Sequence, residues 1–367
     1  MRRWDTGLYI RIAGAGAVLA TAAVVLLTFE RPPVDTVQTG FRGTGMALVY
    51  NPRTLAATAA QHAVPEAPEA ADPEGPRASE VFENVQVLGN VSAAQFGRIM
   101  QAMTEWVSPE QGCNYCHNPE NMADDSVYTK VVARRMLQMT KHINQQWATH
   151  VGQVGVTCWT CHRGNPVPNQ VWATVPDPHP DRVGGYSQNP AGQNIASATV
   201  NYSSLPNDPF TPYLLGDHNI RIQGREALPH GNRASIKETE WNYALMFHFS
   251  QSLGVSCGHC HNTRSLYSWE QSPPARLTAW HGIGMVRDTN INYINPLAPL
   301  WQANPNGPAE GPHGRRIGEL GDPLKVNCAT CHQGAHKPLY GAPMLQDYPE
   351  LNAVTLEERR AEAAPRQ

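Results

Sequence analysis

The chain has 367 residues and a formal net charge of −3, which suggests two packed units or one internally duplicated domain. It contains 31 Pro, 30 Gly and only 8% aromatic residues, so long irregular segments are expected between its helices. No run of basic residues occurs, which argues against a nucleic-acid-binding protein.

The N-terminus carries an apolar segment from Ile12 to Phe29, close to the shortest length for a membrane-spanning helix. Arg2, Arg3 and Arg11 precede it, so the N-terminus is expected in the cytoplasm and the remainder outside. The residues directly after the segment make a poor signal-peptidase site. We therefore expect residues 1–30 to be a retained single-pass anchor.

Residues 31–80 are rich in Pro and Ala and lack helical periodicity over most of their length. We interpret them as an extended tether that lies on a partner or crosses the periplasm. Residues 81–350 hold every cysteine of the chain and form the expected main domain. The charged, Ala-rich tail, residues 351–367, is expected to be a frayed helix.

All eight cysteines belong to four copies of Cys-x-x-Cys-His, the attachment signature of c-type haem. On one helical turn the two sulfurs share a face and can bond the two haem vinyl groups, while the imidazole reaches the iron. The four motifs, numbered one to four along the chain, are Cys113/Cys116/His117, Cys158/Cys161/His162, Cys257/Cys260/His261 and Cys328/Cys331/His332.

Zinc sites and redox dithiols also use Cys-x-x-Cys pairs. Zinc knuckles pair at regular separations, whereas these four motifs are irregularly spaced and each is followed at once by His. Four haem c groups are therefore the favoured interpretation. Their attachment outside the cytoplasm agrees with the orientation expected from the N-terminus.

An internal repeat precedes these motifs, because each is introduced by a predicted helix that carries Met. The fold class expected is mainly α with extensive irregular loops, built from repeated helix–turn–motif units and one transmembrane helix. We expect two-haem halves at about 81–165 and 234–350. Short strands or a wrapping segment are expected between them.

The helical Met residues are candidates for the second axial ligand of each iron. Unit one offers Met100 or Met103, unit two offers Met136 or Met139, and unit three has Met246. A single helical Met usually packs in a core. Repetition before each motif favours ligation, which would raise the reduction potential of those haems.

The helix of unit two is expected to start near Asp124–Ser126 and to end by Gly152. It could supply axial ligands to two different irons. Met136 and His150 lie about 21 Å apart along such a helix, so they would serve different irons. His142 competes with His150 as a ligand, but is expected on the solvated face.

Unit four has no convincing Met, since Met285 lies far upstream of Cys328. A haem ligated by His332 and His150 would explain both the missing Met and the extra His. Three further histidines are expected to be supporting or surface groups: His248, His259 and His281.

The motifs and their helices resemble the tetrahaem cytochrome subunit of purple-bacterial photosynthetic reaction centres over about residues 80–350. The most specific stretches are MTEWVSPEQGCNYCH, VVARRMLQMTKHIN, GVTCWTCHRG, MVRDTNINY and CHQGAHKPLYGAPMLQDYPEL. The resemblance implies three His/Met haems and one bis-His haem. The implied pairs are His117 with Met100, His162 with Met136, His261 with Met246, and His332 with His150.

The resemblance also implies a row of haems in the order three, four, two, one, with the third nearest the bacteriochlorophyll special pair and with potentials that alternate. The implied partners are the L, M and H subunits of the core, a soluble cytochrome c or high-potential iron–sulfur protein as donor, and the antenna ring. The implied place is the bacterial inner membrane, with the haem domain in the periplasm. No Cys precedes Cys113, so the uncleaved helix would replace the lipid anchor that some members have.

Two enzyme classes compete with this electron-transfer role. A membrane-anchored tetrahaem quinol dehydrogenase also has one span and four motifs, but it relies on His or an open position in place of Met. A multihaem reductase would need a five-coordinate haem. The upstream Met residues favour an electron carrier without an enzymatic reaction of its own.

Overall fold

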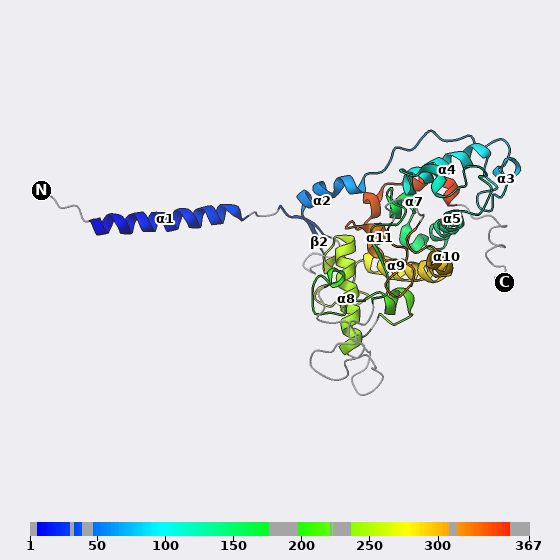
Figure 1. The fold of residues 1–367 in the computed structure, drawn as a ribbon. Coiled ribbons are helices and arrows are strands. Elements are labelled where there is room, and N and C mark those ends of the chain that lie inside the picture. Colours follow the sequence, from blue (N-terminus) through cyan, green and yellow to red (C-terminus); the bar gives the residue numbers. More distant parts are fainter. Residues whose placement is uncertain are drawn as a thin grey trace, which may run out of the picture.

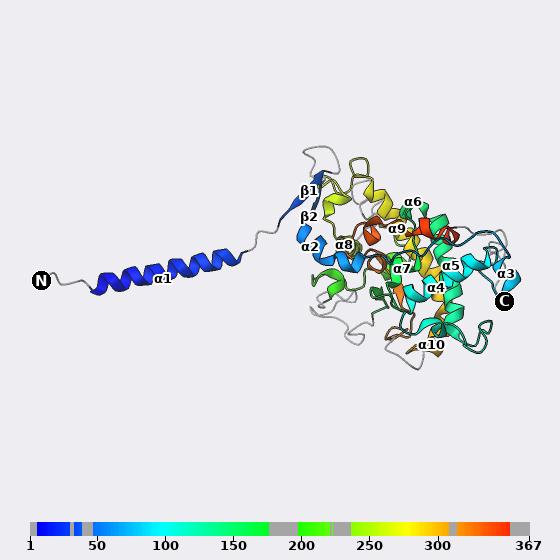
Figure 2. The same cartoon turned by 90° about the horizontal axis from the view of Figure 1, so that it is seen from above.

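The computed structural model describes residues 6–29, 33–38, 47–175, 197–220, 222, 236–307 and 314–352. Within these ranges the protein is mainly helical (Figures 1 and 2). The helices are α1 (Thr6–Thr28), α2 (Pro52–Thr58), α3 (Ala78–Val81), α4 (Ala93–Val107), α5 (Tyr128–Gln146), α6 (Ala148–Val151), α7 (Cys158–His162), α8 (Ile236–Leu253), α9 (Ala275–Thr289), α10 (Ala298–Ala303), α11 (Cys328–His332) and α12 (Met344–Asp347).

The described residues contain two antiparallel sheets of two strands each. Strand β1 (Asp35–Gln38) pairs with β2 (Ala47–Tyr50), and β3 (Val171–Trp172) pairs with β4 (Lys325–Val326). The expectation of short strands between the two halves is met by β3. The rest of that connecting segment lies partly outside the described residues.

Helix α1 has 23 residues and stands apart from the main body (Figures 1 and 2). None of its residues is buried, and at 1.5 Å per residue it is about 35 Å long. Its length and apolar composition are those of a membrane-crossing helix. It extends farther toward the N-terminus than the predicted segment from Ile12.

Residues 50–80 differ in part from the expected extended tether. They include α2, a 3₁₀ helix (Ala59–His62) and the start of α3, and the segment lies on the main body. Trp159 Nε1 donates to the carbonyl of Ala63 at 3.0 Å, and Arg98 donates to the carbonyls of Glu69 and Pro68. The His62 ring packs at 4.4 Å from the ring of Tyr340. Pro- and Ala-rich sequence here provides a strap held by backbone carbonyls, a pattern that helical periodicity does not reveal.

The core consists of two clusters that share helix α5. The first packs α4 against the C-terminal segment, with the rings of Trp106 and Tyr348 at 4.7 Å edge to face. The second joins α5, α8 and α9. Leu137 belongs to the first cluster and Met139 to the second, so α5 presents apolar faces to both halves.

The single helix expected over 124–152 is wrong in two ways. Asp124 does not cap α5; its carboxylate accepts from the backbone and hydroxyl of Ser126, and α5 begins at Tyr128. Trp147 then leaves helical geometry (φ −112°, ψ 26°), which separates α6 from α5. Its indole Nε1 is bonded to Asp288 of α9 at 2.8 Å, so a tertiary contact accompanies the break.

Candidate haem-binding sites

Motifs one and three share one local structure. Their first cysteines, Cys113 and Cys257, lie in short 3₁₀ helices (Gly112–Tyr115 and Cys257–His259) and are exposed. Nδ1 of His117 bonds to the carbonyl of Met122 at 2.9 Å, and Nδ1 of His261 bonds to the carbonyl of Leu266 at 2.8 Å. In both motifs the acceptor lies five residues after the histidine.

Motifs two and four share a different structure, the α-helical turns α7 and α11. Each begins with a reciprocal capping pair, Thr157 with Thr160 and Asn327 with Thr330. Each ends in a left-handed residue, Arg163 or Gln333. A capped turn followed by a left-handed residue is a rigid way to hold the two cysteines on one face.

The histidines of motifs two and four are held by nearer carbonyls. Nδ1 of His162 bonds to the Asn165 carbonyl at 2.8 Å, and Nδ1 of His332 bonds to the Ala335 carbonyl at 2.9 Å. Since a carbonyl can only accept, all four motif histidines carry their proton on Nδ1. This leaves Nε2 with a free lone pair, the arrangement typical of a metal-ligating histidine.

Burial disfavours the charged form of three of these imidazoles, those of motifs two, three and four. It lowers the pKa of His162 and of His261, and it lowers the pKa of His332 to about 4. Neutral imidazole is the form that binds a metal ion. These three histidines are therefore prepared for iron without a proton having to leave.

One cavity of about 860 Å³ is lined by motifs one and two together with the Met residues upstream of them. Its size fits a large organic cofactor. The four Met candidates of units one and two all line it: Met100, Met103, Met136 and Met139.

A feature of the helices distinguishes Met100 and Met136 from their neighbours. Thr104 Oγ1 donates to the Met100 carbonyl, and Thr140 Oγ1 donates to the Met136 carbonyl, both at 2.9 Å. Such a bond back to the preceding turn bends a helix slightly. The same Met-x-x-x-Thr pattern thus recurs at the two residues that the family pattern favours.

Met246 lies on α8, which leads into motif three and packs against the second core cluster. The partly buried Met246 side chain is on the helix expected for it. Helix α8 also lies against α11, so the helix of unit three adjoins motif four.

The rings of His150 and His332 lie 6.1 Å apart, centre to centre, with their planes at 69° to each other. Two imidazoles that bind one metal from opposite sides at about 2 Å have ring centres about 6 Å apart. Nδ1 of His150 bonds to the Thr278 carbonyl at 2.8 Å, and burial lowers the pKa of His150. The structure therefore brings together the predicted ligand pair of haem four, from α6 and α11.

Helix α9 forms the back of the His150 site, which the sequence alone did not indicate. A Cβ at Gly282 would lie 2.6 Å from Cε1 of His150, and one at Gly284 would lie 2.8 Å from the Trp147 indole. The spacing Gly-x-Gly on a helix was the available signal. These glycines let both rings rest directly on the helix backbone.

The expectation that His142 lies on a solvated face is wrong. Its Nε2 donates to Asp288 Oδ2 at 2.6 Å, and Asp288 also accepts from Trp147 and Asn292. Burial alone would raise the pKa of Asp288, but hydrogen bonds from His142, Asn292 and Trp147 bring it to about 2. His142 therefore joins α5 to α9 and leaves His150 as the ligand candidate.

The remaining histidines are not alike. His248 is buried against the Phe210 ring, and burial lowers its pKa to about 3. His259 packs on His336, which follows motif four. His281 lies beside Trp280 on α9. Each of these three rings packs against another ring, and their supporting or surface role remains a prediction.

Arg316 gives an independent reason to expect an anionic cofactor in the cavity. The residue lines the cavity, is 6% exposed, and donates to the Tyr115 hydroxyl at 2.7 Å. Among the described residues no carboxylate forms an ion pair with it, although a buried guanidinium normally has one. The propionates of a haem would supply that charge.

The motifs are neighbours in a definite sequence. Sγ of Cys161 lies 2.8 Å from Sγ of Cys331, so motifs two and four touch. The Gly334 amide, after motif four, donates to the Ser252 carbonyl at the end of α8. With the shared cavity of motifs one and two, these contacts give the spatial order three, four, two, one.

The chain matches the family model described as photosynthetic reaction centre cytochrome C subunit over residues 30–352. It is 52% identical over 336 residues to the photosynthetic reaction center cytochrome c subunit of Rubrivivax gelatinosus, covering 91% of this chain and 88% of the relative. The Thermochromatium tepidum subunit is 50% identical over 351 residues (95% and 83%). The Roseobacter denitrificans subunit is 36% identical over 358 residues (94% and 93%).

Proposed function

Because the chain belongs to the family of photosynthetic reaction centre cytochrome c subunits, we propose that its four motifs each hold one haem c and pass electrons to the photo-oxidised special pair. The family role is electron transfer within the reaction centre. The protein accordingly binds haem c covalently and associates with the reaction-centre core and the membrane.

The ligand pairs are His117 with Met100, His162 with Met136, His261 with Met246, and His332 with His150. The single observation that carries this assignment is the 6.1 Å separation of the His150 and His332 rings, which fits one iron between them. The shared cavity and the Thr104 and Thr140 hydrogen bonds support the choice of Met100 and Met136. Two axial ligands per iron leave no open position for a substrate, which favours an electron carrier over a reductase.

Haem three is the one nearest the membrane-embedded core. Strand β2, which follows the membrane-helix candidate α1, lies against the 3₁₀ helix of motif three. In both views α8 lies on the side of the body next to α1, and α4 of unit one lies on the far side (Figures 1 and 2). Exposed apolar side chains after motif three, Leu266, Tyr267 and Trp280, suit a surface that meets a partner.

Electrons then enter at haem one and leave from haem three. The donor is a soluble periplasmic cytochrome c or a high-potential iron–sulfur protein, and the acceptor side is formed by the L and M subunits with H beneath them. The antenna ring would surround α1, which anchors the subunit in the inner membrane. Haem propionates make the holoprotein more acidic than its sequence charge of −3, which favours a basic donor.

Flash spectroscopy on membranes that contain the protein tests this function. Haem three is reduced beforehand, and the c-type α band is followed together with recovery of the special pair. Oxidation of haem within microseconds, matched to that recovery, is the expected result. Recovery without haem oxidation in membranes with working reaction centres would refute the proposal and favour a quinol-linked role.

A further inference from the structure

Lys130 occupies a position that its own helix does not favour. It lies in the first turn of α5, where unpaired N–H groups carry partial positive charge and repel a cation. It is nevertheless only 7% exposed. A buried ammonium group is stable only when its donors are satisfied, so contacts outside the helix must hold it.

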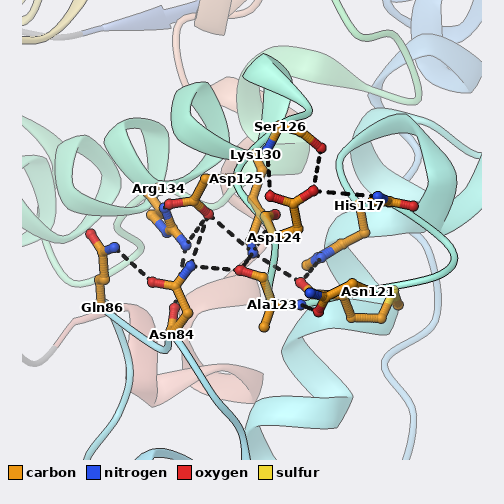
Figure 3. Close-up of polar contacts among 12 residues, drawn as sticks. Asn84, Gln86, His117, Asn121, Ala123, Asp124, Asp125, Ser126, Lys130 and Arg134 are labelled. Carbon is orange, nitrogen blue, oxygen red and sulfur yellow. Dashed lines mark hydrogen bonds and ion pairs between the residues drawn. The ribbon is translucent and has the colours of Figure 1, made fainter.

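The loop that follows motif one supplies those contacts (Figure 3). Nζ of Lys130 lies 2.9 Å from the carbonyl oxygen of Met122, 2.7 Å from that of Ala123 and 2.9 Å from that of Asp124. Three consecutive carbonyls thus match the three hydrogens of the ammonium group. The Asp125 carboxylate lies 3.1 Å away as an ion partner.

One of these carbonyls also orients the haem ligand of motif one. The Met122 oxygen accepts from Nδ1 of His117 at 2.9 Å and from Nζ of Lys130 at the same distance. Lys130, Met122 and His117 all line the cavity expected to hold the haem. A buried positive charge is therefore two hydrogen bonds from the ring that would ligate the iron.

Two effects of this charge act in the same direction. A carbonyl that already accepts from an ammonium group is a weaker acceptor for Nδ1–H, so the imidazole donates less electron density to the iron. The charge itself also disfavours ferric haem, which carries one more positive charge than ferrous haem. Both effects raise the reduction potential.

We propose that Lys130 raises the reduction potential of haem one, through the Met122 carbonyl that holds His117 and through its own charge. Lys130 is thus a positioning residue that also sets the energy at which electrons enter the row. The inference rests on the proposed function, in which His117 ligates haem one.

Asp125 supplies a counter-charge that makes the proposal testable in both directions. Arg134 donates to its two oxygens at 2.7 and 2.8 Å, and Asn84 donates to it at 2.9 Å (Figure 3). The hydrogen bonds from Arg134 hold the pKa of Asp125 well below its usual range. The group is a carboxylate that offsets part of the Lys130 charge.

The experiment is a spectroelectrochemical titration of all four haems in the purified complex, with Lys130→Gln and Lys130→Arg. In Lys130→Gln, the ratio of reduced to oxidised haem one at a fixed potential should fall about tenfold, a shift of about −59 mV for a one-electron couple. Lys130→Arg keeps the charge, so the reduction potential of haem one should stay close to that of the wild-type protein. The potential of haem three should not change in either variant.

Asp125→Asn provides the opposite sign and leaves Lys130 in place. It should raise the ratio of reduced to oxidised haem one, by less than tenfold because Asp125 is 39% exposed. The proposal is overturned if Lys130→Arg lowers the reduction potential of haem one as much as Lys130→Gln does, or if Asp125→Asn does not raise it. Loop geometry, and not charge, would then explain the effect. Should Lys130→Gln fail to mature, Asp125→Asn alone decides.

Peptide mass analysis of the wild-type protein separates this test from that of the proposed function. A haem on Cys113 and Cys116, with the spectrum of His/Met ligation, keeps the assignment of His117 intact whatever the variants do. A wild-type protein without that haem would refute the function itself.

Discussion

Motifs two and four are built as rigid, buried turns, whereas motifs one and three are exposed and held by longer loops. The first pair has capped α-helical turns and histidines bonded three residues ahead. The second pair has 3₁₀ turns and histidines bonded five residues ahead. In the order three, four, two, one, the buried pair lies inside the row and the exposed pair at its ends.

This difference suits a row of haems in which the inner sites are rigid and the outer sites can be reached by redox partners. In the proposed row the inner haems would exchange electrons only with their neighbours, so their surroundings could be closed and stiff. The outer haems would have to approach a donor or an acceptor from outside the subunit, and the exposure of Cys113 and Cys257 would allow that approach. Four substitutions test the difference between the inner and the outer motifs.

The largest effect is expected from Gly254→Ala, at the junction of units three and four. Gly254 has φ +63°, and a Cβ there would lie 2.1 Å from the Gly334 carbonyl oxygen. We expect a loss of about 3 kcal/mol from the positive φ and the clash with backbone.

Thermal unfolding of the holoprotein measures this loss, with Gly112→Ala of motif one as the matched control. Gly112 has a similar φ of +64°, but, apart from its two neighbours in the chain, no atom of the described residues lies within 4 Å of the position that a Cβ would take there. The control should lose about 1 kcal/mol. Equal losses of stability in the two variants would contradict tighter packing at the inner motifs.

His150→Met changes the ligation of haem four from bis-His to His/Met. Its potential should rise by on the order of 100 mV, a fraction of the roughly 0.8 V that axial ligands command. A redox titration resolves the four haems. The assignment of His150 fails if the reduction potential of haem four is unchanged and that of another haem shifts.

Asn327→Ala removes the cap of α11, since Asn327 Oδ1 accepts from the Thr330 amide at 3.2 Å. The loss should be about 1 kcal/mol, the usual value of an N-cap. Gln111 holds the same position before the turn of motif one and makes no capping bond. Gln111→Ala should therefore change the unfolding temperature little, and a similar loss in both variants would remove the distinction.

Asp288→Asn tests the support behind His150 through its pH dependence. The pKa of Asp288 is about 2 in the folded protein, below the roughly 3.9 of an unfolded chain. Its stabilising contribution is therefore complete above about pH 4 and is lost as the pH falls toward 2.

Acid titration monitored at the α bands should disturb haem four before haem one in the wild-type protein. In Asp288→Asn this early step should be absent, because the charge on Asp288 no longer changes. An identical acid profile in the variant would show that Asp288 does not support His150.

The parts of the molecule that depend on local sequence patterns could be predicted. Helices α4, α5, α8 and α9 precede the four motifs, as their apolar spacing and Met residues predicted. The pairing of His150 with His332 was reached from a missing Met and a surplus His. The ligand pairs themselves and the repeat of haem units remain predictions.

What could not be foreseen depends on contacts between distant segments. The break at Trp147 accompanies a bond to Asp288, 141 residues later. The hydrogen bond of His142 to Asp288 could not be predicted without knowing where α9 packs. The strap of residues 50–80 is held through its backbone carbonyls. Every residue has a carbonyl, so no sequence pattern marks the ones that make these contacts. Residues 353–367, expected to be a frayed helix, lie outside the described residues.

A cryo-EM map of the purified reaction-centre complex would test the proposed row of four haems in the order three, four, two, one, with the buried motifs inside it. We expect four haems, one per motif, with the haem of Cys257 and Cys260 nearest the membrane and one iron between His150 and His332. A haem of motif one at the membrane side, or an iron of motif four without His150, would contradict it.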